Sequence, residues 1–395
     1  MTKITIIGAG DVVQNRYLGA AKAVNQEYDF NITDIIDVRS PSTLSSELYS
    51  KGLDRTIRLH QLLDTSPDGL IHLLVNKGLS AHPVIIATPS LFHVPYGFAL
   101  LKHGMKVCIE KPLAVNELHV TQFDQAIQQL GTDRVFLLGY YALEKGLAAF
   151  VLANSGNVPR AYLDLLEPSL DPQQIAEIRS CLGQVRQIRG VLLEGAGTAA
   201  SLNHRSWVLT NASGGNTVET FYHLVCMALP FFGDKSAIKF ADVELSRHRL
   251  TSQWFYKELG EDAAETLTVV KLYTDESVEA RLVCAKYVPK NLHERWMEIE
   301  FEHGRAFADF ESGVLQIEGR NIQLSIGLRY NTKYFTQFAL FAEKLHNPSL
   351  RTEYTLFRDA LLLTLQIRTR GLEHGYNDYD TEDITREFIN MRLGR

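Results

Sequence analysis

Along the first third of the chain, short runs of β-branched and aliphatic residues alternate with stretches whose apolar residues recur at helical spacing. The runs are apolar at nearly every position, which is typical of strands buried on both faces of a parallel sheet. The alternation predicts a parallel sheet with crossover helices. The predicted strands cover residues 4–7, 32–38, 83–87, 106–109 and 134–138, and the predicted helices cover 12–24, 92–102 and 117–130. Strand and helix signals overlap in residues 55–82.

After about residue 140 the pattern changes to period-two alternation with short turns between successive runs. Such a succession predicts a large, mostly antiparallel open sheet. The predicted strands cover residues 185–193, 238–245, 266–273, 277–287, 296–301, 305–310 and 314–317, followed by helices at 334–345 and 353–370. We therefore expect a nucleotide-type α/β domain over 1–140. An α+β domain with one large open sheet follows over 141–395, with C-terminal helices that pack back on the first domain.

Composition narrows the function classes. The 395 residues are 45% hydrophobic and 22% charged, which is ordinary for a globular chain of two domains. The net charge of −6 disfavours nucleic acid and anionic membranes as partners. The four cysteines form no C-x-x-C pair and no zinc-finger spacing, so no metal site is expected. Without a signal-peptide pattern or a long apolar run, the expected location is the cytoplasm.

A glycine turn follows the first predicted strand. Gly8 permits a tight turn, and Gly10 lets the main chain approach a pyrophosphate closely. Asp11 and Val12 open the following helix, whose N-terminal N–H groups would face that pyrophosphate. Val13 stands where a third glycine would complete the dinucleotide-binding fingerprint. An ordinary glycine turn of an α/β sheet is the alternative.

The second predicted strand ends in Asp37, 27 residues after Gly10. A carboxylate there can accept hydrogen bonds from the ribose hydroxyls of NAD and would repel the 2′-phosphate of NADP. Arg39 and Ser40 would instead suit a 2′-phosphate if Asp37 turns away. A helix cap is the structural alternative for Asp37. The expected cofactor is NAD, with NADP possible.

Two further turns lie at the carboxyl ends of predicted strands, where ligands of parallel sheets bind. One holds Glu110 and Lys111 in a Glu-Lys-Pro sequence, and a lysine there could donate a hydrogen bond to a reacting carbinol or carbonyl oxygen. The other holds Thr88 and Pro89, which would border the cofactor, with His93 at the start of the next helix. A solvated lysine and a structural histidine are the alternatives.

A Gly-Gly pair at residues 214–215 precedes a predicted helix in the second domain. Glu219 and His223 are four residues apart and so share one face of that helix. A carboxylate beside an imidazole can fix its tautomer, and the imidazole can then carry a hydroxyl proton. The alternative is a capping box, with Asn216 as N-cap and Glu219 at the third helical position.

Three sequence blocks together resemble the Gfo/Idh/MocA oxidoreductases, the family of glucose–fructose oxidoreductase and inositol 2-dehydrogenase. They are G-A-G-D-V-V-Q-N-R-Y-L-G-A at 8–20, A-T-P-S-L-F-H at 87–93 and K-H-G-M-K-V-C-I-E-K-P-L-A at 102–114. The resemblance implies a Rossmann domain, a sheet-based substrate domain, a homodimer or homotetramer, and Lys111 at the reacting oxygen.

The same resemblance implies that His223 is the general acid/base and that Glu219 stands for its partner carboxylate. The family pattern has Asp at the position of Glu219 and usually a second Asp at the position of Cys226. The longer Glu side chain changes the pairing geometry, and a thiol supplies no carboxylate charge. A catalytic role for Cys226 is not expected, because its helix offers no base other than His223.

Four other residues are candidates for contacts with substrate. Tyr141 and Lys145 are four apart near the end of the first domain, where many relatives carry an Arg-Phe pair. Arg205 and Trp207 precede the Gly-Gly helix and could hold a polar ring by charge and by an apolar face. Interdomain packing and a surface loop, respectively, are equally good alternatives.

The sequence thus predicts an NAD(P)-dependent oxidoreductase that acts on a secondary alcohol or ketone of a sugar, cyclitol or related polyol. One alternative is an NAD-dependent glycoside-cleaving enzyme with no net redox change. Another is a dinucleotide-binding sensor or scaffold that has lost catalysis. The reason to consider it is that Glu219 and Cys226 stand where the family pattern has Asp.

Overall fold

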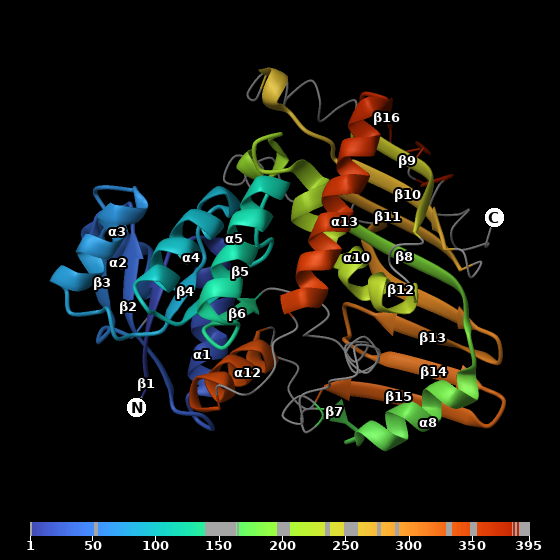
Figure 1. Ribbon diagram of the computed structural model, residues 1–395, viewed down its shortest axis with the longest axis horizontal. Helices are drawn as coiled ribbons and strands as arrows, with labels where there is room; N and C mark the ends of the chain where they lie inside the picture. The colour runs from blue at the N-terminus through green and yellow to red at the C-terminus, as the bar shows by residue number, and fades with distance from the viewer. Residues whose placement is uncertain are drawn as a thin grey trace. The chain divides into compact units, whose positions relative to one another are not determined.

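The computed structural model describes residues 2–50, 54–138, 163, 166–195, 206–233, 238–248, 260–274, 278–288, 292–328, 334–347, 354–380, 382–383 and 385–386. The chain forms two compact units (Figure 1). The first comprises Met1–Glu144, Pro159–Leu165 and Tyr330–Thr355, and the second comprises Lys145–Val158, Leu166–Arg329 and Leu356–Arg395.

The described part of the first unit contains a six-stranded sheet in the order β3-β2-β1-β4-β5-β6. Its strands are β1 (Thr2–Ile7), β2 (Phe30–Asp37), β3 (Arg58–Gln61), β4 (Val84–Ile86), β5 (Val107–Glu110) and β6 (Val135–Leu138). All neighbouring pairs are parallel, which confirms the predicted α/β class. The strand order reverses between β1 and β4, and in such sheets the ligand crevice opens at that point, beyond the carboxyl ends of the strands.

The helices of the first unit are η1 (Val13–Tyr17), α1 (Leu18–Val24), α2 (Pro41–Ser50), α3 (Pro67–Asn76), η2 (Ser90–Phe92), α4 (His93–Lys102), α5 (Glu117–Leu130) and α12 (Phe335–His346). Segment 55–82, ambiguous in the sequence, contains strand β3 and helix α3. A serine cap resolves it, because Ser66 accepts a hydrogen bond from Gly69 N (3.0 Å) and Pro67 takes the first helical position.

Helix α12 belongs to the first unit, although nearly 200 residues separate it from β6. It contacts this unit through aromatic rings. Phe338 stacks on Phe30 of β2 with ring centroids 5.2 Å apart, and Tyr17 packs edge-on against Phe338 at 5.0 Å. All three side chains are fully buried, so α12 completes the apolar core on this side of the sheet.

The described part of the second unit contains a ten-stranded sheet in the order β16-β9-β10-β11-β8-β12-β13-β14-β15-β7. Its strands are β7 (Leu166–Glu167), β8 (Val185–Gly195), β9 (Lys239–His248), β10 (Leu267–Tyr273), β11 (Glu279–Val288), β12 (Glu294–Phe301), β13 (Gly304–Asp309), β14 (Leu315–Gly319), β15 (Ile322–Leu328) and β16 (Asn377–Tyr379). Among these described strands, only β8–β11 and β9–β16 pair in parallel, which confirms a mostly antiparallel sheet. Strand β15 and the short edge strands β7 and β16 were not predicted.

The helices of the second unit are α8 (Pro172–Leu182), η4 (Ser206–Leu209), η5 (Thr217–Phe221), α10 (Tyr222–Ala228), η6 (Leu229–Phe231), η8 (Gly260–Asp262) and α13 (Tyr354–Glu373), the last beginning at the boundary between the units. Helices α10 and α13 lie over the same face of the sheet (Figure 1). Helix α8, which the sequence reading omitted, begins with a capping box between Asp171 and Gln174.

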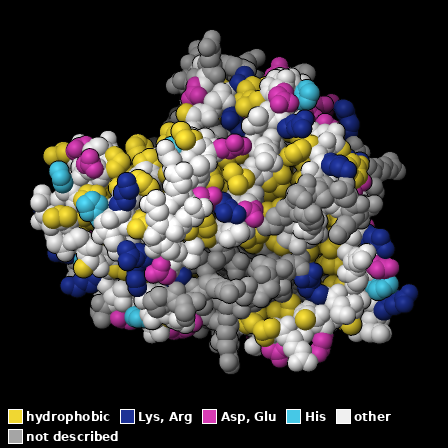
Figure 2. Space-filling view, viewed as in Figure 1, with side chains coloured by type: hydrophobic (Ala, Val, Ile, Leu, Met, Phe, Trp, Pro, Cys, Tyr) yellow, Lys and Arg dark blue, Asp and Glu magenta, His cyan; other side chains and the backbone are white. Residues whose placement is uncertain are grey.

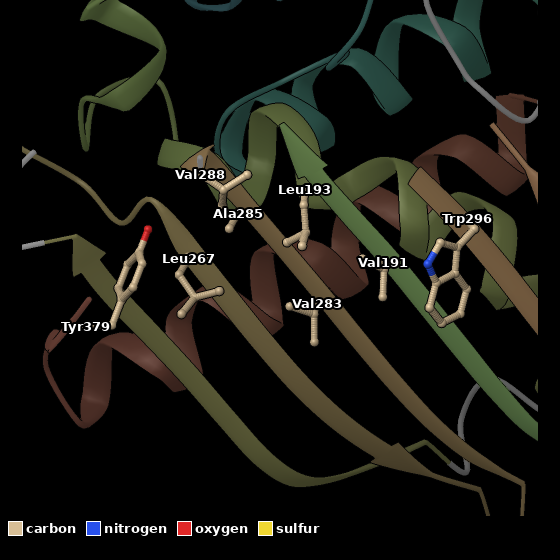
Figure 3. Close-up of a cluster of buried hydrophobic side chains, with 8 residues drawn as sticks. All are labelled: Val191, Leu193, Leu267, Val283, Ala285, Val288, Trp296 and Tyr379. Atoms are coloured by element: carbon tan, nitrogen blue, oxygen red, sulfur yellow. The ribbon is translucent and has the colours of Figure 1, made fainter. Parts of the chain in front are cut away.

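A cluster of buried side chains from alternate strand positions stabilises the large sheet (Figure 3). Its members are Val191, Leu193, Leu267, Val283, Ala285, Val288, Trp296 and Tyr379. Val191 lies opposite both Val283 and Trp296, so three neighbouring strands contribute one continuous row. Full burial of each larger aliphatic side chain contributes about 1.5–3 kcal/mol. Because alternate side chains of β8, β11 and β12 are buried in this way, their sequences show the period-two alternation that predicted these strands.

No helix within the described residues is both long and apolar enough to span a bilayer. On the face drawn in Figure 2, basic and acidic side chains are interspersed.

Candidate functional site

The turn after β1 is built around Gly8, where the backbone requires glycine. Gly8 has a φ of +94°, and a Cβ there would lie 2.5 Å from the carbonyl oxygen of Ala87. Its N–H donates to the carbonyl of Ile36 at 2.7 Å. The turn is therefore held tightly between the carboxyl ends of β2 and β4, with no room for a side chain.

Gly10 differs from Gly8, because its missing side chain faces open space. It is exposed, and a Cβ there would meet no atom within 4 Å. Asp11 is exposed as well, and Val12 is half-buried. The main chain at Gly10 can thus be approached from outside the protein, as the predicted pyrophosphate site requires.

The helix predicted over 12–24 is not uniform. Its first turn is π-helical over Val13–Tyr17, and a regular α-helix begins at Leu18. Val12 and Val13 are β-branched and have lower helix propensity than straight-chain residues. Single π-turns within helices occur frequently at functional sites, and this one adjoins the glycine turn.

Asp37, the expected ribose acceptor, holds the glycine turn. Its Oδ2 accepts a hydrogen bond from Ala9 N (2.7 Å), and its Oδ1 accepts from Arg39 N and Arg39 Nε (2.9 Å each). Burial opposes the charged form, but the hydrogen bonds from Arg39 and Ala9 outweigh it and lower the pKa of Asp37. The carboxylate is therefore ionised and engaged with the main chain that would cradle the pyrophosphate.

Arg39 connects this carboxylate to helix α2. Its guanidinium donates to Ala9 O (2.8 Å) and to Glu47 Oε2 (2.7 Å), and its side chain is 34% exposed. Gln14 donates to the same two groups, at 2.9 and 3.2 Å. Sequence reasoning missed Gln14, which lies in the 8–20 block without a role assigned to it, and Glu47, which lies in no quoted block.

The turn after β4 contains a buried hydroxyl that has no hydrogen-bond partner among the described residues, Thr88 Oγ1. A buried polar atom in that state costs free energy, so it points to a ligand that completes it. Pro89 beside it is exposed. The open main chain at Gly10 and the hydroxyl of Thr88 both fit a dinucleotide at this edge of the sheet.

His93 joins the turns that follow β4 and β5. The ring is 1% exposed, with Nδ1 at 2.7 Å from Pro112 O and Nε2 at 2.9 Å from Thr88 O. It therefore fixes the turn after β4 against the Glu-Lys-Pro turn.

The Glu-Lys-Pro turn begins at the last residue of β5. Glu110 is 6% exposed, and its Oε2 accepts a hydrogen bond from Lys111 N at 2.8 Å. Lys111 itself is half-buried, and the Lys111–Pro112 bond is cis. The Glu110 side chain thus fixes the main chain from which the lysine side chain projects.

The Gly-Gly turn of the second unit is shaped around a buried carboxylate. Gly215 has a φ of +64°, and a Cβ there would lie 2.6 Å from Glu265 Oε1. The same oxygen accepts a hydrogen bond from Thr217 N at 3.0 Å. Arg368 of α13 forms an ion pair with Glu265 at 3.3 Å. Glu265 therefore caps the helix from a distant segment, a role that its sequence position does not reveal.

The capping box that the sequence offered as an alternative is not formed. Asn216 has helical backbone angles and makes no side-chain cap. Its Nδ2 instead donates to Cys284 O at 3.1 Å, which ties the start of the helix to β11. The nearby carboxylate of Glu265 takes the capping role.

Glu219 and His223 lie on one continuous helix with a change of geometry between them. Glu219 is in the π-helical turn and is 3% exposed, whereas His223 is in the first turn of α10 and is 4% exposed. Tyr222 donates to Phe357 O at 2.8 Å and anchors this turn to α13. Burial raises the pKa of the Cys226 thiol, which disfavours a thiolate.

The candidate substrate residues fall mostly outside the described part of the chain. Tyr141, Lys145 and Arg205 are not among the described residues. Trp207 lies in η4, but its side chain is outside that part too.

Comparison with known proteins finds a family match for the N-terminal third of the chain. Residues 2–137 match the Gfo/Idh/MocA model, described as an oxidoreductase family with an NAD-binding Rossmann fold. The resemblance carried by the three sequence blocks is thereby confirmed for this segment. No curated protein sequence matches the chain.

Solved structures share the fold over both units. The 3-ketoreductase KijD10 from Actinomadura kijaniata, solved with NADP and TDP-benzene, has a TM-score of 0.63 at 14% identity, covering 96% of this chain and 99% of that one. A candidate oxidoreductase from Erwinia carotovora atroseptica has the same TM-score at 13% identity, with the same coverage. A third, from Thermotoga maritima, has a TM-score of 0.63 at 14% identity, covering 93% and 97%.

Proposed function

We propose that this chain, whose residues 2–137 belong to the Gfo/Idh/MocA oxidoreductase family, is an NAD(P)-dependent oxidoreductase acting on a sugar, cyclitol or related polyol. The group transformed is a secondary alcohol or its ketone. The observation that carries the proposal is the carboxyl edge of the first sheet. There an open glycine turn, a buried hydroxyl on Thr88 and the Lys111 turn follow the neighbouring strands β1, β4 and β5.

Residues of the first unit hold and orient the cofactor. Gly8, Gly10, Asp11 and Val12 present the main chain to the pyrophosphate, and Thr88 offers its hydroxyl nearby. When bound, a nicotinamide cofactor accepts or supplies the hydride. Pro89, His93 and Glu110 shape the two turns around it, and Asp37 and Arg39 face the adenosine end.

Two side chains handle charge and protons at the reacting group. Lys111 donates a hydrogen bond to the carbinol or carbonyl oxygen and stabilises negative charge there. His223 takes the hydroxyl proton during oxidation and returns it during reduction. Glu219, one turn earlier on the same helix, orients the imidazole. The family pattern supports the roles of Lys111 and His223, and it has Asp where this chain has Glu219. The burial of both Glu219 and His223 supports their pairing.

Tyr141, Lys145, Arg205 and Trp207 are the proposed substrate contacts. The substrate class is supported by the family resemblance and by the similarity to KijD10, a 3-ketoreductase crystallised with a TDP compound. Use of NAD(P) favours the cytoplasm as location, and the broad sheet of the second unit favours a homodimer or homotetramer, which light scattering would measure.

The test compares Lys111→Ala and His223→Asn with the wild type on D-glucose, D-xylose, myo-inositol and the corresponding keto compounds. Turnover is followed as NAD(P)H absorbance, and NADH binding as fluorescence. Each variant should bind NADH normally and lose more than about tenfold in turnover, because a positioned acid or base typically contributes about 10²–10⁴-fold. Full turnover in either variant would remove that residue from the mechanism.

The same experiment separates the alternatives. Cleavage of p-nitrophenyl glycosides in the presence of NAD, without net NADH formation, would identify a glycoside-cleaving enzyme instead. NADH binding with no turnover on the whole panel would identify a sensor or scaffold.

A further inference from the structure

The Glu110 carboxylate connects the Glu-Lys-Pro turn to a segment far along the chain. One of its oxygens accepts the N–H of Lys111, as described above. The other, Oε1, accepts a hydrogen bond from the phenol of Tyr334 at 3.0 Å. The two residues are 224 positions apart, and both belong to the first unit. The carboxylate is therefore held from both sides, by the turn it orders and by the residue that precedes α12.

The backbone of Tyr334 is held in an unfavourable conformation. Its φ is +68° and ψ is −7°, and it is the one residue other than glycine with positive φ among the described residues. A left-handed conformation costs a bulky L-residue about 1–2 kcal/mol. Such strain persists only where surrounding contacts impose it, and it gathers at functional sites.

Aromatic rings pack against Tyr334. The ring of Tyr334 lies 4.9 Å from that of Tyr17, edge-on, and 6.4 Å from that of Phe338. Tyr17 is fully buried and ends the π-helical turn that follows the glycine loop. Burial and the charge of Glu110 raise the pKa of Tyr17, so the carboxylate lies near this second phenol as well. The glycine loop, the Lys111 turn and the start of α12 thus meet around one buried carboxylate.

From this arrangement we propose that Tyr334 is a positioning residue for Lys111. Its phenol holds Glu110 in the conformation that fixes the main chain at Lys111, so that the lysine side chain starts from a fixed point at the cofactor edge. A carboxylate that lost this donor would adopt other rotamers, and the turn would lose its constraint. The catalytic consequence rests on the proposed role of Lys111, whereas the constraint on the turn does not.

The chain offers a matched control for this proposal. Tyr354, also in the first unit, donates from its phenol to Asp124 Oδ1 at 2.6 Å, across 230 positions. Tyr334→Phe and Tyr354→Phe therefore remove the same atom from the same kind of long-range bond. Only the first removes it from the carboxylate that orders the Lys111 turn.

The experiment measures hydrogen exchange of the Lys111 amide in the full chain, with NADH as the cofactor probe. Pro112 has no N–H, so Lys111 carries the last exchanging amide before Leu113 and reports the turn. Tyr334→Phe should accelerate its exchange about tenfold or more through local opening, and Tyr354→Phe should change it less than about twofold. Both variants should bind NADH as the wild type does, because neither residue is proposed to touch it.

Two results of the exchange experiment would overturn the proposal. One is wild-type exchange at Lys111 in Tyr334→Phe, and the other is equal acceleration in both variants, which would reflect general destabilisation. On the panel compound that the wild type turns over best, Tyr334→Phe should lower kcat about fivefold or more with KM for the dinucleotide unchanged. An unchanged kcat there would also refute the positioning role. If the wild type turns over no compound, the proposed function fails, and the exchange result still decides the role of Tyr334.

Discussion

Substituting alanine at each of the two glycines of the first turn separates folding from cofactor binding. At Gly8, the alanine Cβ would lie 2.5 Å from Ala87 O, and φ is +94°. The left-handed conformation alone costs about 1–2 kcal/mol, and the contact with a main-chain oxygen adds to it. At Gly10 a Cβ meets nothing within 4 Å, so the free energy of unfolding should stay within about 0.5 kcal/mol of wild type.

Gly10→Ala should weaken cofactor binding although it leaves the stability of the protein unchanged. The methyl group of Gly10→Ala would occupy the open space through which the pyrophosphate reaches the main chain, and NADH should bind about tenfold more weakly, or about 1.4 kcal/mol. Urea unfolding measures the stability, and NADH fluorescence titration measures the affinity. Wild-type affinity in Gly10→Ala would refute the assignment of this turn to the pyrophosphate. A large loss of stability there would refute the steric argument itself.

Three other outcomes are expected. Glu265→Ala should lower the free energy of unfolding by about 3–5 kcal/mol, because it leaves Arg368 without its buried partner and Thr217 N without an acceptor. Urea unfolding measures this loss, and a loss below about 1 kcal/mol would contradict the capping role. Burial lowers the pKa of His82 below 6.5, so the unfolded chain binds more protons than the folded chain below that pH. The free energy of unfolding should therefore fall on acidification from pH 7 to 5, and it should fall less in His82→Asn. A wild type whose stability does not change over this range would contradict this. Cys181 is exposed and the three other cysteines are buried, so native protein should react with one equivalent of a thiol reagent, and rapid labelling of more than one would conflict with the fold.

Local patterns sufficed for most of the first unit. Its strands β1, β2, β4, β5 and β6 were predicted to within about two residues at most ends, because buried parallel strands are apolar at every position. Segment 55–82 was ambiguous, because β3 is short and none of its four residues is fully buried. The residues of the glycine and Glu-Lys-Pro turns stand at strand ends, where sequence alone marks them.

In the second unit, the sequence predicted the alternating strands and the Gly-Gly helix but not the contacts that hold that helix. A capping box was one local interpretation of Asn216 and Glu219, and the chain uses Glu265 instead. Sequence reading considers partners a few residues away. The actual acceptor comes from a residue 48 positions downstream.

The amino-acid order by itself determined most of the strands and which turns carry glycine, lysine and histidine, since these depend on neighbouring residues. Only the tertiary structure decided that Asp37 binds the glycine turn, that Glu265 caps the Gly-Gly helix and that Tyr334 holds Glu110. The physical reason is range. Backbone propensity and burial periodicity act within a few residues, whereas the partner of a buried carboxylate is whichever donor the fold brings within 3 Å of it.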